Sequence, residues 1–220
     1  MKEKKSIFRS YFTLCDSRGL TFLELIFVIS IFGILSGVIL FKFGDFTADV
    51  NFQNLAQDIA LRITQAQRSA ISGTENANTY GGVVPSYGVY FEADPSATAA
   101  NNKHFVYFFD LGEDGLYDTF GPSCGGPLVA GAECIQDTTI TTGAYISNIC
   151  ATNYNGQQCG YSGVNVTFKR PFPDARMRVL PMQPSSPTEV QIELTSPTGA
   201  QKTIFINSVG HVEVLDGGVL

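Results

Sequence analysis

Arg18-Gly19-Leu20-Thr21-Phe22-Leu23-Glu24 precedes an apolar run, residues 25–41, that holds no charged side chain. Two serines and two glycines are its only residues that are neither aliphatic nor aromatic. A carboxylate is costly to remove from water unless it gains a partner, so acids within apolar segments usually serve a function. The stretch therefore predicts an apolar N-terminal helix in which Glu24 has a specific task.

Residues 18–24 resemble the cleavage signal of the type IV prepilin and pseudopilin family. That signal is a short basic leader that ends in glycine, followed by an apolar helix whose fifth mature residue is glutamate. The resemblance implies cleavage after Gly19 by a prepilin peptidase and methylation of the new amino group of Leu20. It also implies that Glu24 pairs with the Leu20 ammonium of a neighbouring subunit, which would set the axial register of a filament.

Two other interpretations of this stretch are open. A secretory signal peptide also begins with a basic segment and an apolar core, but its cleavage site follows the core at an A-x-A-like sequence. Residues 43–49 offer no such sequence. A simple signal anchor is also compatible, since residues 20–43 would form roughly 36 Å of helix. That interpretation leaves the Gly19 junction and Glu24 unexplained.

The distribution of charge predicts the orientation of this segment. Residues 1–19 carry a net charge of +3, whereas the flank beyond the apolar run has Lys42 together with Asp45 and Asp49. By the positive-inside rule, we expect a single-pass protein of the inner (cytoplasmic) membrane with a cytoplasmic N-terminus and a periplasmic or extracellular globular domain. Removal of the leader changes the net charge from −6 to about −9, which argues against nucleic-acid binding.

The helix is predicted to continue from about Leu20 to a stop at Ser72-Gly73, because no proline interrupts it. Apolar residues at spacings of three and four form one stripe of an amphipathic helix: Phe52, Leu55, Ile59, Ile63, Ala66 and Ala70. The predicted fold class is α+β and type IV pilin-like. It has a long N-terminal helix, with its first half transmembrane, packed on an antiparallel β-sheet domain.

Short runs rich in Val, Ile, Phe and Tyr, separated by turn residues, predict the strands of that domain. These runs are residues 87–92, 103–111, 164–169, 189–195, 203–207 and 211–215. Residues 189–195 and 201–207 flank a Pro-Thr-Gly turn and predict a hairpin. The series over residues 160–216 is similar to the C-terminal β-domain of H-type minor pseudopilins and related minor pilins.

The predicted domain organisation follows from these segments. Residues 1–19 are the cleaved leader, 20–43 the transmembrane half of the helix and 44–73 its amphipathic half. Residues 74–220 form an extracytoplasmic β-rich domain, in which 93–160 is a variable insertion outside the resemblance.

Gly33 and Gly37 form a G-x-x-x-G pair within the apolar run. Such a pair is typical of helices that pack closely against each other. The resemblance adds a second interpretation, in which the helix partly unwinds near Gly33 on assembly. Phe41 stands where many major pilins have proline, which favours a minor pilin or pseudopilin.

Four cysteines remain beyond the leader, an even number that predicts disulfide bonds in an oxidising compartment. Three connectivities are open. We favour the two local loops, Cys124–Cys134 and Cys150–Cys159, because both lie in irregular, Gly- and Asn-rich sequence. A zinc site is the alternative, but the chain has no C-x-x-C spacing.

A candidate calcium loop lies within residues 110–118. Asp110, Asp114 and Asp118 match positions one, five and nine of an EF-hand loop, with the Leu116 carbonyl at position seven. Gly115 occupies the position of the sharp turn. The third and twelfth positions lack acids, so an acidic β-turn is the alternative interpretation.

Lys169, Arg170, Arg176 and Arg178 form a basic cluster. Such a cluster could contact nucleic-acid phosphates. A rigid Arg-Pro turn whose charges pair with the acids of a neighbouring subunit is the alternative, and the acidic background disfavours nucleic acid.

The predicted function is a structural one. No G-x-S-x-G, H-E-x-x-H, Walker or dinucleotide motif is present, so we do not predict an enzyme; an anchored hydrolase is the alternative. The resemblance implies a minor pilin or pseudopilin of a type IV pilus or type II secretion-like filament. Its implied partners are other pilin subunits, the prepilin peptidase and an inner-membrane assembly platform, with the subunit membrane-embedded before assembly. A DNA- or surface-binding minor pilin is the alternative function.

Overall fold

The computed structural model describes residues 21–73, 85–93, 101–118, 124, 133–183 and 185–217. Within the first range, the side chains of residues 39–43 and 45 are not described. The predicted leader, Gly19 and Leu20 therefore lie outside the described residues. The chain forms two compact units, residues 1–46 and residues 47–220.

Helix α1 (Phe22–Ser72) contains 51 residues. Its first turn is capped by Thr21, whose side-chain oxygen accepts a hydrogen bond from the N–H of Glu24. At its other end, Gly73 adopts a φ of +62°, and its N–H donates to the carbonyl of Ser69. Glycine reaches this left-handed conformation without a steric penalty, so the Ser72-Gly73 stop has a backbone cause.

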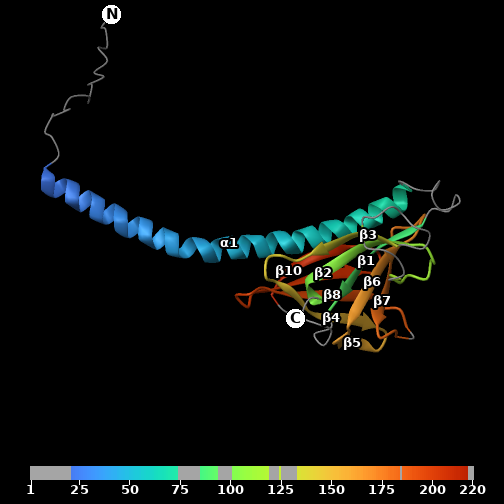
Figure 1. Ribbon diagram of the computed structural model, residues 1–220. Coiled ribbons are helices and arrows are strands. Elements are labelled where there is room, and N and C mark those ends of the chain that lie inside the picture. Colours follow the sequence, from blue (N-terminus) through green and yellow to red (C-terminus); the bar gives the residue numbers. More distant parts are fainter. Residues whose placement is uncertain are drawn as a thin grey trace, which may run out of the picture. The chain divides into compact units, whose positions relative to one another are not determined.

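Ten strands form two antiparallel sheets of five strands each (Figure 1). Sheet A has the order β3-β2-β1-β6-β7, and sheet B has the order β10-β9-β8-β4-β5. The elements are β1 (Ser86–Glu92), η1 (Asn101–Lys103), β2 (His104–Asp110), β3 (Cys134–Thr139), β4 (Tyr145–Asn153), β5 (Gly156–Cys159), β6 (Gly163–Phe168), β7 (Ala175–Leu180), β8 (Glu189–Thr195), β9 (Gln201–Asn207) and β10 (Val212–Asp216).

The predicted hairpin is present, with Glu189 paired to Asn207 and Thr195 to Gln201. The sequence did not lead us to β3, β4, β5 or β7. Strand β7 carried a usable signal, since Ala175, Met177 and Val179 are buried in alternation. Residues 93–160, which we expected to form a variable insertion, contribute β2 and β4, and both are interior strands.

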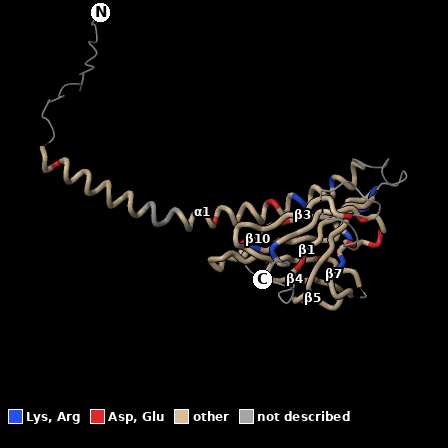
Figure 2. The backbone as a smooth tube through the Cα atoms, in the orientation of Figure 1, with Lys and Arg blue, Asp and Glu red and all other residues tan. Residues whose placement is uncertain are grey.

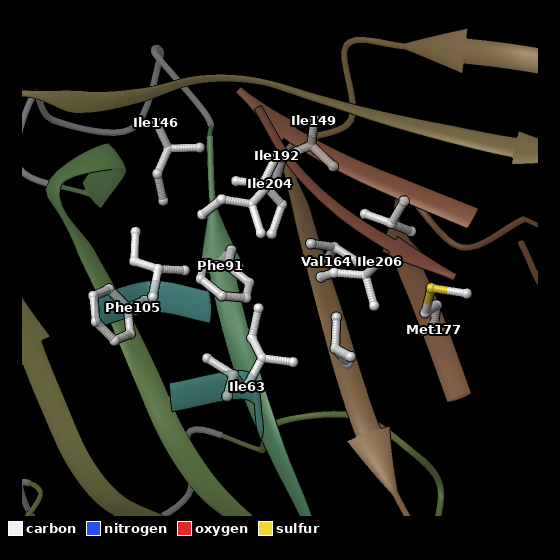
Figure 3. Packing of buried hydrophobic residues seen from close by; sticks show 14 of the residues in the cluster. Ile63, Phe91, Phe105, Ile146, Ile149, Val164, Met177, Ile192, Ile204 and Ile206 are labelled. Atoms are coloured by element: carbon white, nitrogen blue, oxygen red, sulfur yellow. The ribbon is translucent and has the colours of Figure 1, made fainter. Parts of the chain in front are cut away.

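One hydrophobic core joins both sheets and the C-terminal part of α1 (Figure 3). From α1 it receives Ile59, Ile63, Ala66 and Ala70, which are fully buried, as the predicted stripe requires. The two alanines let the helix backbone approach the strands closely, while the isoleucines fill the space between them. The strand residues labelled in Figure 3 belong to the same cluster: Phe91, Phe105, Ile146, Ile149, Val164, Met177, Ile192, Ile204 and Ile206.

Two polar contacts attach this part of α1 to loops of the strand domain. The Gln67 side-chain amide donates to the carbonyls of Pro173 and Gly210, which lie in the β6–β7 and β9–β10 connections. The guanidinium of Arg170 lies against Gly73, where it faces the carbonyl end of the helix. A cation in that place stabilises a helix because it complements the helix dipole.

The predicted fold class needs correction. Most of the described strand domain is two packed antiparallel sheets, whereas we expected a helix packed on one antiparallel sheet domain. Among the described residues, no helix combines the length and the apolar character that a membrane crossing requires. The prediction of a transmembrane first half is therefore wrong.

We expect Ile63→Ala to lower the free energy of unfolding by about 2–5 kcal/mol, because it leaves a cavity between α1 and the sheets. Leu61 lies on the same helix and is 63% exposed, so Leu61→Ala should change stability by about 0.5 kcal/mol or less. Urea unfolding of the full chain in a mild detergent, followed by circular dichroism, measures both. Equal effects of the two substitutions would contradict the packing described above.

Candidate functional site

The N-terminal part of α1 presents an unusual surface. Its apolar side chains between Phe22 and Val38 are almost all exposed, with Phe22 at 79% and Phe32 at 72%. Figure 2 shows one acidic position near the start of this stretch, followed by uncharged residues. Soluble domains rarely expose so many neighbouring apolar side chains unless the surface contacts a partner.

Glu24 has a local role that the sequence interpretation missed. Thr21-Phe22-Leu23-Glu24 fits the S/T-x-x-E capping box, and the N–H of Glu24 lies 3.3 Å from the Thr21 hydroxyl oxygen. A carboxylate in the first turn also complements the positive end of the helix dipole. Among the described residues, no ion pair involves Glu24. The capping box was visible in the sequence and supplies a second reason for an acid here.

Gly33 and Gly37 have no explanation within their own chain. A methyl group added at either position would meet no other atom within 4 Å. Both residues lie within α1, where glycine weakens a helix by about 1 kcal/mol relative to alanine. A close-packing partner outside the described chain would explain their smallness.

A second candidate site is the loop of residues 111–118, which crosses the outer face of sheet A. Alternation in β2 directs Phe105, Tyr107 and Phe109 into the main core, so Phe108 lies on the opposite face. The ring of Tyr117 packs on Phe108 and Tyr90, at centroid distances of 5.3 and 5.7 Å. The loop thus covers apolar side chains that would otherwise face water.

Side-chain oxygens hold the backbone of this loop in place. Asp110 Oδ2 accepts from the Gly115 N–H at 3.0 Å, and Asp114 Oδ1 accepts from the Leu116 N–H at 2.9 Å. Glu133, at the start of β3, accepts from the N–H groups of Leu111 and Asp118. Gly115 takes a φ of +82°, which explains the glycine at the turn. The acidic turn that we weighed against calcium is therefore present.

Asp110 and Glu133 are buried carboxylates. Asp110 is fully buried, and its Oδ1 atom has no hydrogen-bond partner. Burial raises the pKa of Asp110; the Asp114 carboxylate adds to the rise, while the Gly115 N–H and the Arg176 guanidinium oppose it. Burial likewise raises the pKa of Glu133, and the nearby Asp118 and Asp110 carboxylates add to that rise. The Asp110 charge thus increases the cost of ionising Glu133.

The predicted calcium ligands are only partly brought together. Asp110 is buried, whereas Asp114 and Asp118 are exposed. In the described part of the chain, no three His, Cys, Asp or Glu side chains converge closely enough to hold a metal ion. Glu133 is the residue that sequence reasoning missed, and its 15-residue separation from Asp118 left no local pattern to reveal it.

The four basic residues lie in two places: three contact the 111–118 loop, and Arg170 lies at the end of α1. Lys169 forms an ion pair with Glu113, and Arg176 donates to the Glu113 carbonyl at 3.3 Å. The Arg178 side chain lies over Gly115. With Arg170 at the end of α1, all four cations contact other parts of the chain. These contacts lie within one chain, whereas the alternative interpretation paired the cations with the acids of a neighbouring subunit.

Both favoured disulfides are present: Cys124–Cys134 and Cys150–Cys159. The second joins the edge strand β5 to β4 at a directly paired position. The first ties the chain beyond the 111–118 loop to the start of β3, next to Glu133. That placement limits how far the loop can move from the sheet.

No family model matches the chain, and no curated protein or solved structure gives a significant match. The resemblance of residues 18–24 to a prepilin signal therefore stays a prediction. The predicted localisation, a single-pass inner-membrane protein with a cytoplasmic N-terminus, is corrected by the same observation as the fold class. No described helix is long and apolar enough for such a span.

The raised pKa values predict how stability depends on pH in buffer free of divalent cations. Asp110 and Glu133 keep their protons to a higher pH in the folded chain than their ordinary pKa values of 3.8 and 4.5 allow. The folded state then binds more protons, so the free energy of unfolding falls as pH rises from about 4 toward 7.

Asp110→Asn should make this decline shallower, because the amide stays neutral and can still accept from Gly115. Urea unfolding between pH 4 and 7 measures the slope, with the exposed Asp174→Asn as the control. A slope in Asp110→Asn as steep as in the unsubstituted chain would show that this carboxyl does not contribute.

Proposed function

We propose that this chain is a structural subunit of a filament, of the minor pilin or pseudopilin type, and that it assembles through the N-terminal part of α1. The observation that carries this proposal is the exposed apolar surface of that helix between Phe22 and Val38. Helices with such a surface become stable in water when they bundle with other helices, since each buried apolar side chain contributes about 1.5–3 kcal/mol.

The composition of the surface favours a helical partner. A run with one carboxylate at its start and two glycines four residues apart suits close helix–helix contact better than a site for a small polar ligand. The strand domain offers no competing enzymatic arrangement that we could assign from its described residues. The resemblance of residues 18–24 to a prepilin signal independently points to assembly.

Glu24 would act in assembly as one half of an ion pair. Cleavage after Gly19 would create an ammonium on Leu20, and the Glu24 carboxylate of an adjacent subunit would meet it as the helices bundle. Two charges are then desolvated together and compensate each other, so the pair favours one axial register over others. In the subunit by itself, the Glu24 N–H donates to the Thr21 hydroxyl oxygen at the start of α1.

The DNA-binding alternative receives no support from a specific contact. The cations that would meet phosphates already contact Glu113, Gly115 or the end of α1. We therefore propose only the structural function.

Glu24→Gln separates the two roles of this residue. Glutamine preserves a capping box, so the helix start should be unchanged, but it cannot form the proposed ion pair. We expect incorporation into sheared filaments to fall at least about tenfold, which corresponds to about 1.4 kcal/mol. Immunoblotting of filament and cell fractions in the native host measures this.

Asp49→Asn is the matched control, because it neutralises another exposed acid of α1 without touching the apolar stretch. It should assemble normally. If Glu24→Gln also assembled normally, Glu24 would be explained by the capping box alone and the proposed ion pair would be wrong.

Gly33→Leu tests whether helices approach closely at this position. In a single chain the new side chain meets nothing, and leucine favours a helix more than glycine does, so helix content should be kept or raised. Assembly should fall sharply, because the leucine would separate the packed helices. Circular dichroism of the subunit and the same filament fractionation provide the two measurements; undiminished assembly would exclude close packing at Gly33.

A further inference from the structure

The 111–118 loop combines two features that meet in cation-binding loops. Asp110, the last residue of β2, accepts a hydrogen bond from the Gly115 N–H through one carboxylate oxygen. Asp114, within the loop, accepts one from the Leu116 N–H in the same way. These bonds hold the backbone curled around the remaining oxygen of Asp110. By themselves they are the bonds of an acidic turn.

The second feature is independent of that turn. Asp110 Oδ1 is completely buried and has no hydrogen-bond partner among the described residues. A buried carboxylate oxygen without a donor is costly. Arg176, whose charge acts on the Asp110 carboxylate, donates to the Glu113 carbonyl and forms no hydrogen bond with this oxygen. A cation beside this oxygen would compensate its charge, and no described side chain places one there.

Glu133, which immediately precedes β3, brings a second buried carboxylate to the loop. Its two oxygens accept the N–H groups of Leu111 and Asp118, the residues that begin and end the loop. Each oxygen still has a free lone pair, since a carboxylate oxygen can accept two bonds. The Asp110 carboxylate contributes to the raised pKa of Glu133, so the two carboxyl groups interact electrostatically.

We propose that the 111–118 loop binds a calcium ion between Asp110 Oδ1 and the Glu133 carboxylate, beneath the turn at Gly115. Calcium takes six to eight oxygen ligands and accepts backbone carbonyls and water among them. Because only two buried carboxylates converge, carbonyl oxygens of the loop, with that of Leu116 the first candidate, and water complete the shell. The exposed Asp114 and Asp118 add negative potential at its entrance.

Such a site is expected to be weak. Calcium modules with few charged ligands bind in the range of about 10⁻⁴–10⁻³ M. Binding would nevertheless stabilise the fold, because the ion compensates two buried charges that repel each other in its absence. It would also hold the loop over Phe108 and Tyr117. This proposal does not depend on filament assembly, and its test uses the unassembled subunit.

The test compares melting temperatures of the full chain, kept in solution by a mild detergent, in 2 mM EDTA and in 10 mM CaCl₂. We expect calcium to raise the melting temperature by about 3–8 °C, from the binding energy at this concentration and the size of the chain. Excess EDTA should reverse the rise. Asp110→Asn should reduce it to about 1 °C or less, and Asp174→Asn, an exposed acid outside the loop, should keep it.

A luminescence measurement locates the ion without an acidic substitution. The chain has no tryptophan, so terbium bound in the loop would be sensitised by tyrosine, and Tyr117 is the tyrosine within the loop. Tyr117→Phe should remove most of the emission excited at about 280 nm while leaving the calcium-dependent rise in melting temperature intact. Calcium should compete with terbium.

Two results would overturn the proposal. The first is the absence of any calcium-dependent rise in the unsubstituted chain. The second is a rise in Asp110→Asn as large as in the unsubstituted chain, which would place calcium elsewhere. If Asp110→Asn does not fold, unchanged terbium emission in Tyr117→Phe would overturn it instead.

Discussion

Burial of one face of α1 is the interaction on which the strand domain depends. Ile59, Ile63, Ala66 and Ala70 contact residues of both sheets, so the helix closes a core that neither sheet could enclose alone. Gln67 contacts the Pro173 loop, 106 residues away in sequence, and Arg170 lies against Gly73, so both contacts join the helix to distant loops. In the part of the helix before residue 47, by contrast, the apolar side chains from Phe22 to Val38 are almost all exposed.

This division of α1 explains why its two parts have different tasks. A buried stripe is satisfied within the chain and carries no information about function. An exposed apolar stretch is unfavourable in water, and a partner that covers it gains the full hydrophobic contribution. Glu24 and the two glycines modify that stretch without making it polar. The proposed function rests on this contrast: the apolar side chains of one part of the helix are buried within the chain, and those of the other part are exposed.

The outer face of sheet A shows how charges far apart in sequence become one structure. Glu113 receives Lys169 and Arg176, while Asp110 and Glu133 anchor loop amides. The cations that resembled a nucleic-acid patch and the acids that resembled a calcium loop are neighbours here. The contacts of Glu113 with Lys169 and Arg176 explain why basic and acidic residues gather on this face. Among the described carboxylates of this face, the buried Oδ1 of Asp110 has no hydrogen-bond partner, which is why calcium, and not DNA, is proposed for it.

Features formed by residues close together in the sequence could be predicted from the sequence alone. Capping by Thr21, the stripe at spacings of three and four, the Gly73 stop, the 189–207 hairpin and the two short disulfide loops all involve residues within a few turns of each other. The predicted membrane span was wrong, since no helix among the described residues combines the required length and apolar character. Only the tertiary structure placed Glu133 beside Asp110, Arg170 against Gly73 and β4 inside sheet B. Those contacts join segments that are far apart in the sequence, so no local residue pattern predicts them. The energies of the contacts also depend on burial, which exists only once the chain has packed.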